Sequence, residues 1–233
     1  MIEDLVPSWT VCEHTFATSL GDPDALLFPE EAARVAQAVP KRRHEFAAVR
    51  VCARTALGRL GLPPVPLLTS KRGAPQWPDG VVGSMTHCEG YRAAVVARSS
   101  EAASIGIDAE PNGPLPDGVH GLVILPSEQE MLRRLAALDP ATHWDRLLFS
   151  AKETVFKTWY PLTGRELDFT EAELTIDPAA ADPAAGTFEA RLLVPGPVVG
   201  GRRVDAFTGR WKADKGLVLT AVVLPAPGAP EAG

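Results

Sequence analysis

The chain of 233 residues has little cysteine and no long apolar run, and each shortage excludes a class of protein. Its three cysteines are odd in number and widely separated, so they match neither a disulfide framework nor the spacing of a zinc site. No apolar stretch approaches the roughly 20 residues of a membrane-spanning helix. The N-terminus has neither the basic start nor the apolar run of a secretory signal. We therefore expect a cytoplasmic protein with reduced thiols and no membrane partner.

Basic residues are not in excess either. The 23 Lys and Arg are outnumbered by 29 Asp and Glu, which gives a formal net charge of −6. This balance argues against general nucleic-acid binding. The hydrophobic content of 45% is ordinary for a folded protein, and the length suits one or two domains with a buried core.

The apolar pattern changes along the chain between the helical period and strand-like alternation. Helices are expected at 29–39, 41–60, 126–138 and 143–160. Strands are expected at 9–16, 81–97 (a hairpin turning at Glu89-Gly90), 171–176, 187–194, 204–211 and 216–224. The Ala-, Pro- and Asp-rich residues 178–186 favour a loop, and 225–233 a disordered tail.

The two halves of the chain repeat one order of elements. A long helix, at about 44–60 and again at 145–160, is followed by β-segments and a closing hairpin. This order predicts an α+β protein with two similar subdomains, residues 1–107 and 108–224, followed by the tail. Ligand sites form preferentially between such units.

Acidic residues stand at the junction of these halves. Asp108 and Glu110 are two residues apart on an expected strand, so their side chains share a face. Glu153 and Lys157 share a face of the expected helix 143–160. Three carboxylates form the hard oxygen site that Mg²⁺ takes, and the lysine would meet a bound phosphate. A solvated turn and a helix-surface ion pair are the alternatives for the two motifs taken singly.

Cations and small polar residues lie upstream of these acids. The helix 41–60 carries a basic stripe, which is either a solvated face or an anion site: Arg42, Arg43, Arg50 and Arg54. Lys71 and Arg72 begin a loop rich in turn residues. The polar group Ser84, Thr86 and His87 interrupts a valine-rich strand, which suggests ligand contacts, although a satisfied core histidine is an equal alternative.

Four motifs, in this order, resemble a known family. They are Lys-Arg-Arg-x-Glu-Phe (41–46), Ser-Met-Thr-His-Cys-x-Gly-Tyr (84–91), Gly-Ile-Asp-Ala-Glu (106–110) and Phe-Ser-Ala-Lys-Glu-x-x-x-Lys (149–157). The sequence resembles the 4′-phosphopantetheinyl transferases of the large single-chain kind. Those enzymes activate carrier proteins of siderophore, non-ribosomal peptide and polyketide synthases. The resemblance covers about residues 41–224.

The resemblance implies that phosphopantetheine is transferred from coenzyme A to a serine of an apo acyl or peptidyl carrier protein, releasing 3′,5′-ADP. It implies that Asp108, Glu110 and Glu153 hold Mg²⁺ or Mn²⁺. Asp108, Glu153 and Lys157 would be the catalytic residues. Glu153 is the candidate base for the serine proton, with a metal-bound water as the alternative. The family's fold is two similar α+β subdomains with the site between them.

The same resemblance implies a binding set for coenzyme A. Arg42 and Arg50 would hold the adenosine phosphates, with Lys71 or Arg72 helping. The remaining contacts would come from Ser84, Met85, Thr86, His87, Asp108, Lys152 and Lys157.

Two positions are open in this comparison with the family. Ala74 stands where relatives often have lysine, and the inward-facing arginine is either Arg42 or Arg43.

The carrier partner would be acidic and helical, and it would dock near Trp159–Arg165 or Asn112–Gly121. A monomer suffices, since one chain holds both subdomains. The rival readings are a Mg²⁺-dependent nucleotide pyrophosphate (coenzyme A) hydrolase, a non-catalytic coenzyme A-binding regulator, and a structural protein.

Overall fold

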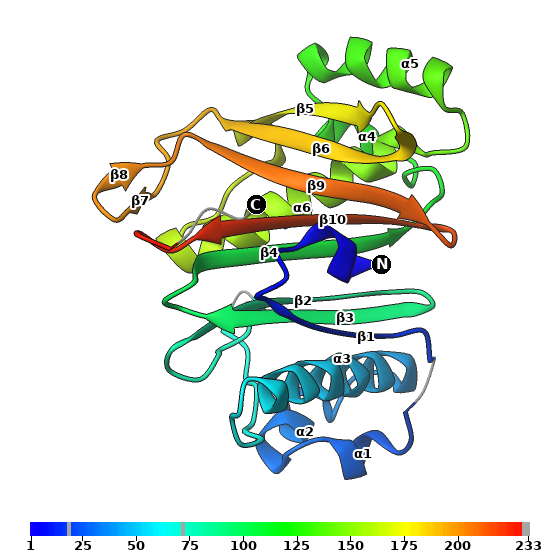
Figure 1. The fold of residues 1–233 in the computed structure, drawn as a ribbon. Coiled ribbons are helices and arrows are strands. Elements are labelled where there is room, and N and C mark those ends of the chain that lie inside the picture. The colour runs from blue at the N-terminus through cyan, green and yellow to red at the C-terminus, as the bar shows by residue number, and fades with distance from the viewer. Residues whose placement is uncertain (18–19, 71–72, 230–233) are drawn as a thin grey trace.

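The computed structural model describes residues 1–17, 20–70 and 73–229, and it confirms the α+β class with two sheet-and-helix subdomains. Figure 1 shows the two main sheets side by side, with β4 of one next to β2 of the other. All strand pairs are antiparallel, in the orders β1-β3-β2, β4-β10-β9-β6-β5 and β7-β8. The strands are β1 (Val11–Thr15), β2 (Val81–Cys88), β3 (Tyr91–Arg98), β4 (Ala102–Pro111), β5 (Ala172–Ala179), β6 (Asp182–Leu192), β7 (Val198–Val199), β8 (Arg202–Arg203), β9 (Ala206–Asp214) and β10 (Leu217–Pro225).

Each subdomain has one long helix that packs on its sheet. α3 covers the three-stranded sheet and α6 covers the five-stranded sheet (Figure 1). α3 begins with Pro40 in its first turn, and α6 is followed by the capping residue Gly164, whose φ of 64° is left-handed. The α-helices are α1 (Pro23–Leu26), α2 (Pro29–Val35), α3 (Pro40–Arg59), α4 (His120–Val123), α5 (Gln129–Leu138) and α6 (Trp144–Thr163). Short 3-10 turns occur at Ile2–Leu5, Pro126–Glu128 and Phe169–Glu171. None of the described helices is long and apolar enough to cross a membrane.

Hydroxyl side chains join the facing edges of the two main sheets. Ser84 Oγ accepts from the Ile107 backbone N–H at 3.1 Å, and Thr86 Oγ1 accepts from Ala109 N–H at 3.2 Å. Side chains of β2 therefore satisfy these two backbone N–H groups of β4. The subdomains meet along this line.

α6 approaches β4 closely because β4 has a glycine beneath it. A Cβ at Gly106 would lie 2.2 Å from Thr154 O and 2.3 Å from Thr158 Oγ1. Such distances leave no room for a side chain, so only glycine fits there. The close contact brings the polar face of α6 beside Asp108.

Three features differ from the sequence-based expectations. Residues 178–186 are not a loop, because β5 and β6 extend through most of them; Pro178 is accommodated because β5 is an edge strand. The expected boundary at 107 falls inside β4, and the chain passes between the sheets at 99–101. Part of the predicted disordered tail is ordered, since Pro225 ends β10 and Ala226 is buried and donates to Glu101 O at 2.9 Å. Residues 230–233 lie outside the described part.

Two residues expected to bind coenzyme A have buried side chains that are held by contacts within the protein. Arg50 is 2% exposed and donates to Leu67 O at 3.0 Å and to Phe46 O at 3.2 Å, with Glu31 3.6 Å away. Burial lowers the pKa of Arg50 to about 10. The guanidinium therefore lies in the interior of the N-terminal subdomain, with Nη2 buried and without a hydrogen-bond partner among the described residues, and its contact with phosphates stays a prediction.

Lys152 is the second such residue. Its Nζ lies 2.9 Å from Glu128 Oε2 and also donates to Val123 O and Phe169 O. Both side chains of the pair are 1% exposed, and burial lowers the pKa of Lys152. The pair connects α6 to the segments around α5, and the assisting role expected for Lys152 stays a prediction.

Replacing Lys152 tests this structural role. In Lys152→Met the carboxylate of Glu128 stays buried without its cation, and the free energy of unfolding should fall by about 3–5 kcal/mol. The double variant Lys152→Met/Glu128→Gln should recover much of that loss, because no charge is left buried. Denaturant unfolding of both variants is the measurement. Arg133→Met, which breaks an exposed pair with Glu130, is the control and should change stability little. A mild single-variant effect with no recovery in the double variant would contradict the role.

Candidate functional site

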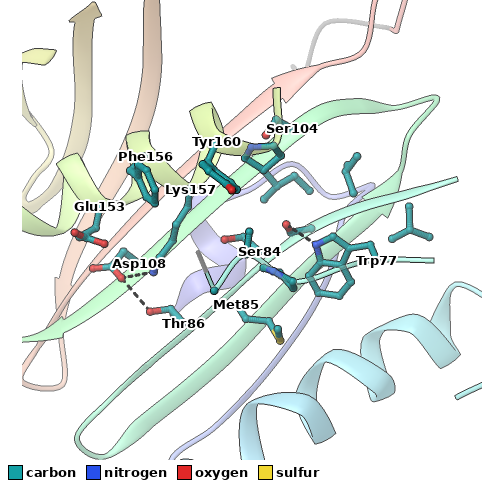
Figure 2. A pocket seen from close by; sticks show the side chains of 18 of the residues that line it. Trp77, Ser84, Met85, Thr86, Ser104, Asp108, Glu153, Phe156, Lys157 and Tyr160 are labelled. Atoms are coloured by element: carbon teal, nitrogen blue, oxygen red, sulfur yellow. Dashed lines mark hydrogen bonds and ion pairs between the residues drawn. The ribbon is translucent and has the colours of Figure 1, made fainter. Parts of the chain in front are cut away.

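A cavity of about 630 Å³ lies where the two subdomains meet. Figure 2 shows side chains from β2, β4 and α6 converging on it. It is lined, among others, by the following residues: Arg42, Trp77, Ser84, Met85, Thr86, His87, Ser104, Asp108, Glu153, Phe156, Lys157 and Tyr160. Most of the predicted site residues therefore share one cavity.

Asp108 is the best-anchored side chain of this cavity. Its Oδ1 accepts from Lys157 Nζ at 2.6 Å and from Thr86 Oγ1 at 3.1 Å (Figure 2), and its Oδ2 accepts from Ser150 Oγ at 2.8 Å. The residue is 4% exposed. Its donors come from β2 and from α6, so the carboxylate is fixed by both subdomains.

Glu153 and Lys157 lie one helical turn apart on the cavity face of α6. Burial raises the pKa of Glu153, the nearby charge of Lys157 opposes that rise, and the negative charge of Asp108 adds to it. Lys157 Nζ also donates to Ile107 O at 3.1 Å. Within this cavity, a desolvated acid therefore lies beside a fixed cation.

Glu110 is placed differently from Asp108, although both belong to β4. Its Oε2 accepts from Arg146 Nη1 at 3.1 Å, and it does not line the cavity. Burial, and secondarily the charge of Asp108, raises the pKa of Glu110.

Across residues 1–17, 20–70 and 73–229, no three His, Cys, Asp or Glu are placed to hold a metal ion. The predicted cage of Asp108, Glu110 and Glu153 is therefore not preformed. Asp108 and Glu153 do fit Mg²⁺, which commonly takes one or two protein carboxylates together with phosphates and water.

Arg42 and His87 form the basic edge of the cavity. Arg42 donates from Nη1 to Nε2 of His87, which is therefore the neutral tautomer with its proton on Nδ1. Burial and, after it, the nearby positive charges of Arg42 and Lys157 lower the pKa of His87 to about 4. Arg43 instead pairs with Asp24. Arg42 is thus the inward-facing arginine of the pair that the sequence left open.

Other predicted contacts are placed as follows. The hydroxyls of Ser84 and Thr86 already accept from β4, so these residues line the cavity with part of their hydrogen-bonding capacity used. Met85 lines the cavity, as does Ala74. Lys71 and Arg72 lie outside the described residues.

Three aromatic residues of the cavity were not predicted. Trp77 donates from Nε1 to Gly83 O at 2.9 Å, which fixes its ring against β2. Phe156 and Tyr160 lie on α6 with ring centroids 5.7 Å apart. The helical spacing from Glu153 to Tyr160 was a sufficient signal for both, since positions three and four apart share a face.

The chain matches two family models. Residues 30–97 match the 4′-phosphopantetheinyl transferase N-terminal domain, and residues 104–191 match the 4′-phosphopantetheinyl transferase superfamily. The interval between the two matches, residues 98–103, contains the connection from β3 to β4, where the chain passes from one sheet to the other.

Curated relatives cover most of the chain. The 4′-phosphopantetheinyl transferase Svp of Streptomyces mobaraensis is 71% identical over 227 residues, which is 97% of this chain and 90% of the relative. The 4′-phosphopantetheinyl transferase PptT of Mycobacterium tuberculosis is 44% identical over 225 residues, 96% of this chain and 98% of the relative. Enterobactin synthase component D of Salmonella typhimurium is 35% identical over 145 residues, 61% of this chain and 58% of the relative. The chain therefore belongs to the 4′-phosphopantetheinyl transferases of the large single-chain type.

Proposed function

We propose that the chain transfers the 4′-phosphopantetheine group of coenzyme A to a serine hydroxyl of an apo acyl or peptidyl carrier protein. The other product is 3′,5′-ADP. The observation that supports this most directly is that one cavity between the subdomains gathers Asp108, Glu153 and Lys157 together with the Arg42–His87 edge.

The charges of the cavity suit a donor with several phosphates. Arg42 enters from α3 and Lys157 from α6, so cations reach a bound molecule from both subdomains. Lys157 Nζ is held by two acceptors and remains one turn from Glu153, beside the space that a pyrophosphate would fill. Trp77, Phe156 and Tyr160 supply apolar walls for the uncharged parts of coenzyme A.

The reaction breaks one phosphoanhydride bond. The serine oxygen attacks the phosphorus that carries the pantetheine arm, and the bridging oxygen leaves with 3′,5′-ADP. Glu153 would accept the serine proton, and a water molecule is the alternative acceptor. A carboxylate with a raised pKa suits this task, because a base works best when its pKa approaches the working pH. Lys157 would offset negative charge that grows on the leaving group.

Asp108 and Glu153 would hold Mg²⁺ or Mn²⁺, with Glu110 joining them only if it leaves Arg146. The ion, when bound, neutralises charge on the pyrophosphate. The donor set consists of carboxylates, with no sulfur or imidazole, which suits a hard cation.

The partner would be a carrier protein, and the chain would act as a monomer in the cytoplasm. One relative is named a component of enterobactin synthase, which supports a synthase carrier as the acceptor. The loop Asn112–Gly121 is largely exposed and remains a docking candidate. The other docking candidate, Trp159–Arg165, is less suited to docking, because Trp159 is fully buried and donates from its indole nitrogen to Arg165 O.

Intact mass of an apo carrier protein tests the reaction. With coenzyme A and Mg²⁺, the carrier should gain one phosphopantetheine, and EDTA should abolish the gain until Mg²⁺ is restored in excess. Glu153→Gln should slow transfer roughly 100-fold or more, as expected for loss of a general base or a metal ligand. Glu130→Gln is the matched control, because Glu130 is an exposed glutamate of α5. Unmodified carrier in every condition would contradict the proposal.

The raised pKa of Glu153 predicts a particular pH profile. If the ionised carboxylate is required, the rate should rise with pH and level off above that raised pKa. Lys157 lowers the pKa of Glu153, so Lys157→Met should move the rising limb to higher pH as well as slow the reaction. Single-turnover rates between pH 4.5 and 8.5 measure both effects. A rising limb at the same pH in the variant would show that Glu153 does not control it.

A further inference from the structure

A buried ionic cluster lies behind the Arg42–His87 edge, and the mechanism above does not use it. Arg92 of β3 has a side chain 5% exposed, and Glu45 of α3 one 13% exposed. Arg92 stands directly opposite His87 in the pairing of β2 with β3, so both side chains point to one face of the sheet. Glu45 approaches them from α3, which covers that face.

Glu45 is shared between two neighbours. Its Oε1 lies 3.9 Å from Arg92 Nη2, and its Oε2 lies 3.8 Å from His87 Nε2. Over the described part of the chain, Nε and Nη1 of Arg92 are buried and have no hydrogen-bond partner. Such a loosely matched buried guanidinium is unfavourable for stability, so packing alone does not account for it.

Together, the cluster of Arg92 and Glu45 and the Arg42–His87 edge carry an excess of positive charge beside the cavity. Arg42 and Arg92 contribute two positive charges, Glu45 contributes one negative charge, and His87 is neutral, which leaves a net charge of +1. Charges in such a poorly solvated place act more strongly than charges in water. The excess lies beside the cavity edge formed by Arg42 and His87.

We propose that Arg92 is a positioning residue of the active site. With Glu45 it forms a buried ionic support behind His87, and this support leaves Arg42 and His87 available to the phosphates of the donor. Without Arg92, the carboxylate of Glu45 is left beside Arg42 and His87 and competes with the phosphates for them. This inference rests on the proposed function, because it takes coenzyme A as the bound molecule.

Steady-state kinetics with coenzyme A as the varied substrate tests the proposal. Arg92→Met should raise KM for coenzyme A roughly tenfold and leave kcat within about twofold. A tenfold change is typical for the loss of one interaction between neighbouring charged groups. Arg92→Lys keeps the charge and should restore most of the affinity. Arg98→Met is the matched control on the same strand: Arg98 bonds Leu60 O, far along β3 from His87, and its loss should not change KM.

A double variant separates positioning from a merely structural role. In Arg92→Met/Glu45→Gln the competing carboxylate is gone, so coenzyme A should bind several-fold more tightly than to Arg92→Met alone. Isothermal titration with coenzyme A in the absence of carrier measures this directly. Thermal melts of each variant show whether the protein is folded at the assay temperature.

The imidazole of His87 gives a spectroscopic signature. The charged groups that face it are Arg42 and Glu45 of α3, Arg92 of β3, Lys157 of α6 and Asp108 of β4. Removal of one of these cations favours the protonated ring, so the pKa of His87 should rise in Arg92→Met. The NMR shift of its Cε1–H against pH reports that change.

The proposal is overturned if Arg92→Met lowers the melting temperature while KM and the titrated affinity stay at wild-type values. It is also overturned if the double variant binds coenzyme A no better than Arg92→Met. A wild-type protein that binds coenzyme A but modifies no carrier would refute the proposed function. The titrations would then still decide the role of Arg92.

Discussion

The carboxylate of Asp108 is the contact on which the arrangement of the site depends. It belongs to a strand of the five-stranded sheet, yet one of its donors, Thr86, comes from the three-stranded sheet, and two, Ser150 and Lys157, come from α6. Thr86 also accepts from the backbone of β4, so one hydroxyl links the two sheets and the acid at once. The geometry of the cavity is therefore set by how the two subdomains meet, and a shift of either subdomain would move Asp108 relative to the other cavity residues.

The electrostatics of the cavity favour binding a cation and an anion together. Burial raises the pKa of Glu153 and lowers that of His87, so each buried group is displaced toward its neutral form. A divalent cation would stabilise the ionised carboxylate, and a phosphate would stabilise the protonated imidazole. A metal-bound pyrophosphate brings both partners in one molecule, which is why the proposed donor suits this cavity better than a neutral ligand would.

The sequence predicted the fold well where local periodicity decides it. The spacing of Glu153 and Lys157, and the alternation of Asp108 and Glu110, placed these residues on the correct elements. The burial of individual side chains was harder to predict from the sequence. Arg50 is eight residues from Arg42, which rotates it by about 80° around the helix and turns it into the interior. Lys152 is about 100° from Glu153 around α6, and it meets Glu128, whose position depends on tertiary packing.

The central claim is that the cavity between the subdomains transfers phosphopantetheine to a carrier protein. The stoichiometry of the two products tests this claim most directly. The measurement is chromatographic quantification of 3′,5′-ADP alongside the mass of the carrier, over a single time course with Mg²⁺. The account predicts one 3′,5′-ADP for each carrier modified, and no 3′,5′-ADP when the carrier is left out. Cleavage of coenzyme A that proceeds equally without a carrier would contradict it and identify a pyrophosphate hydrolase instead.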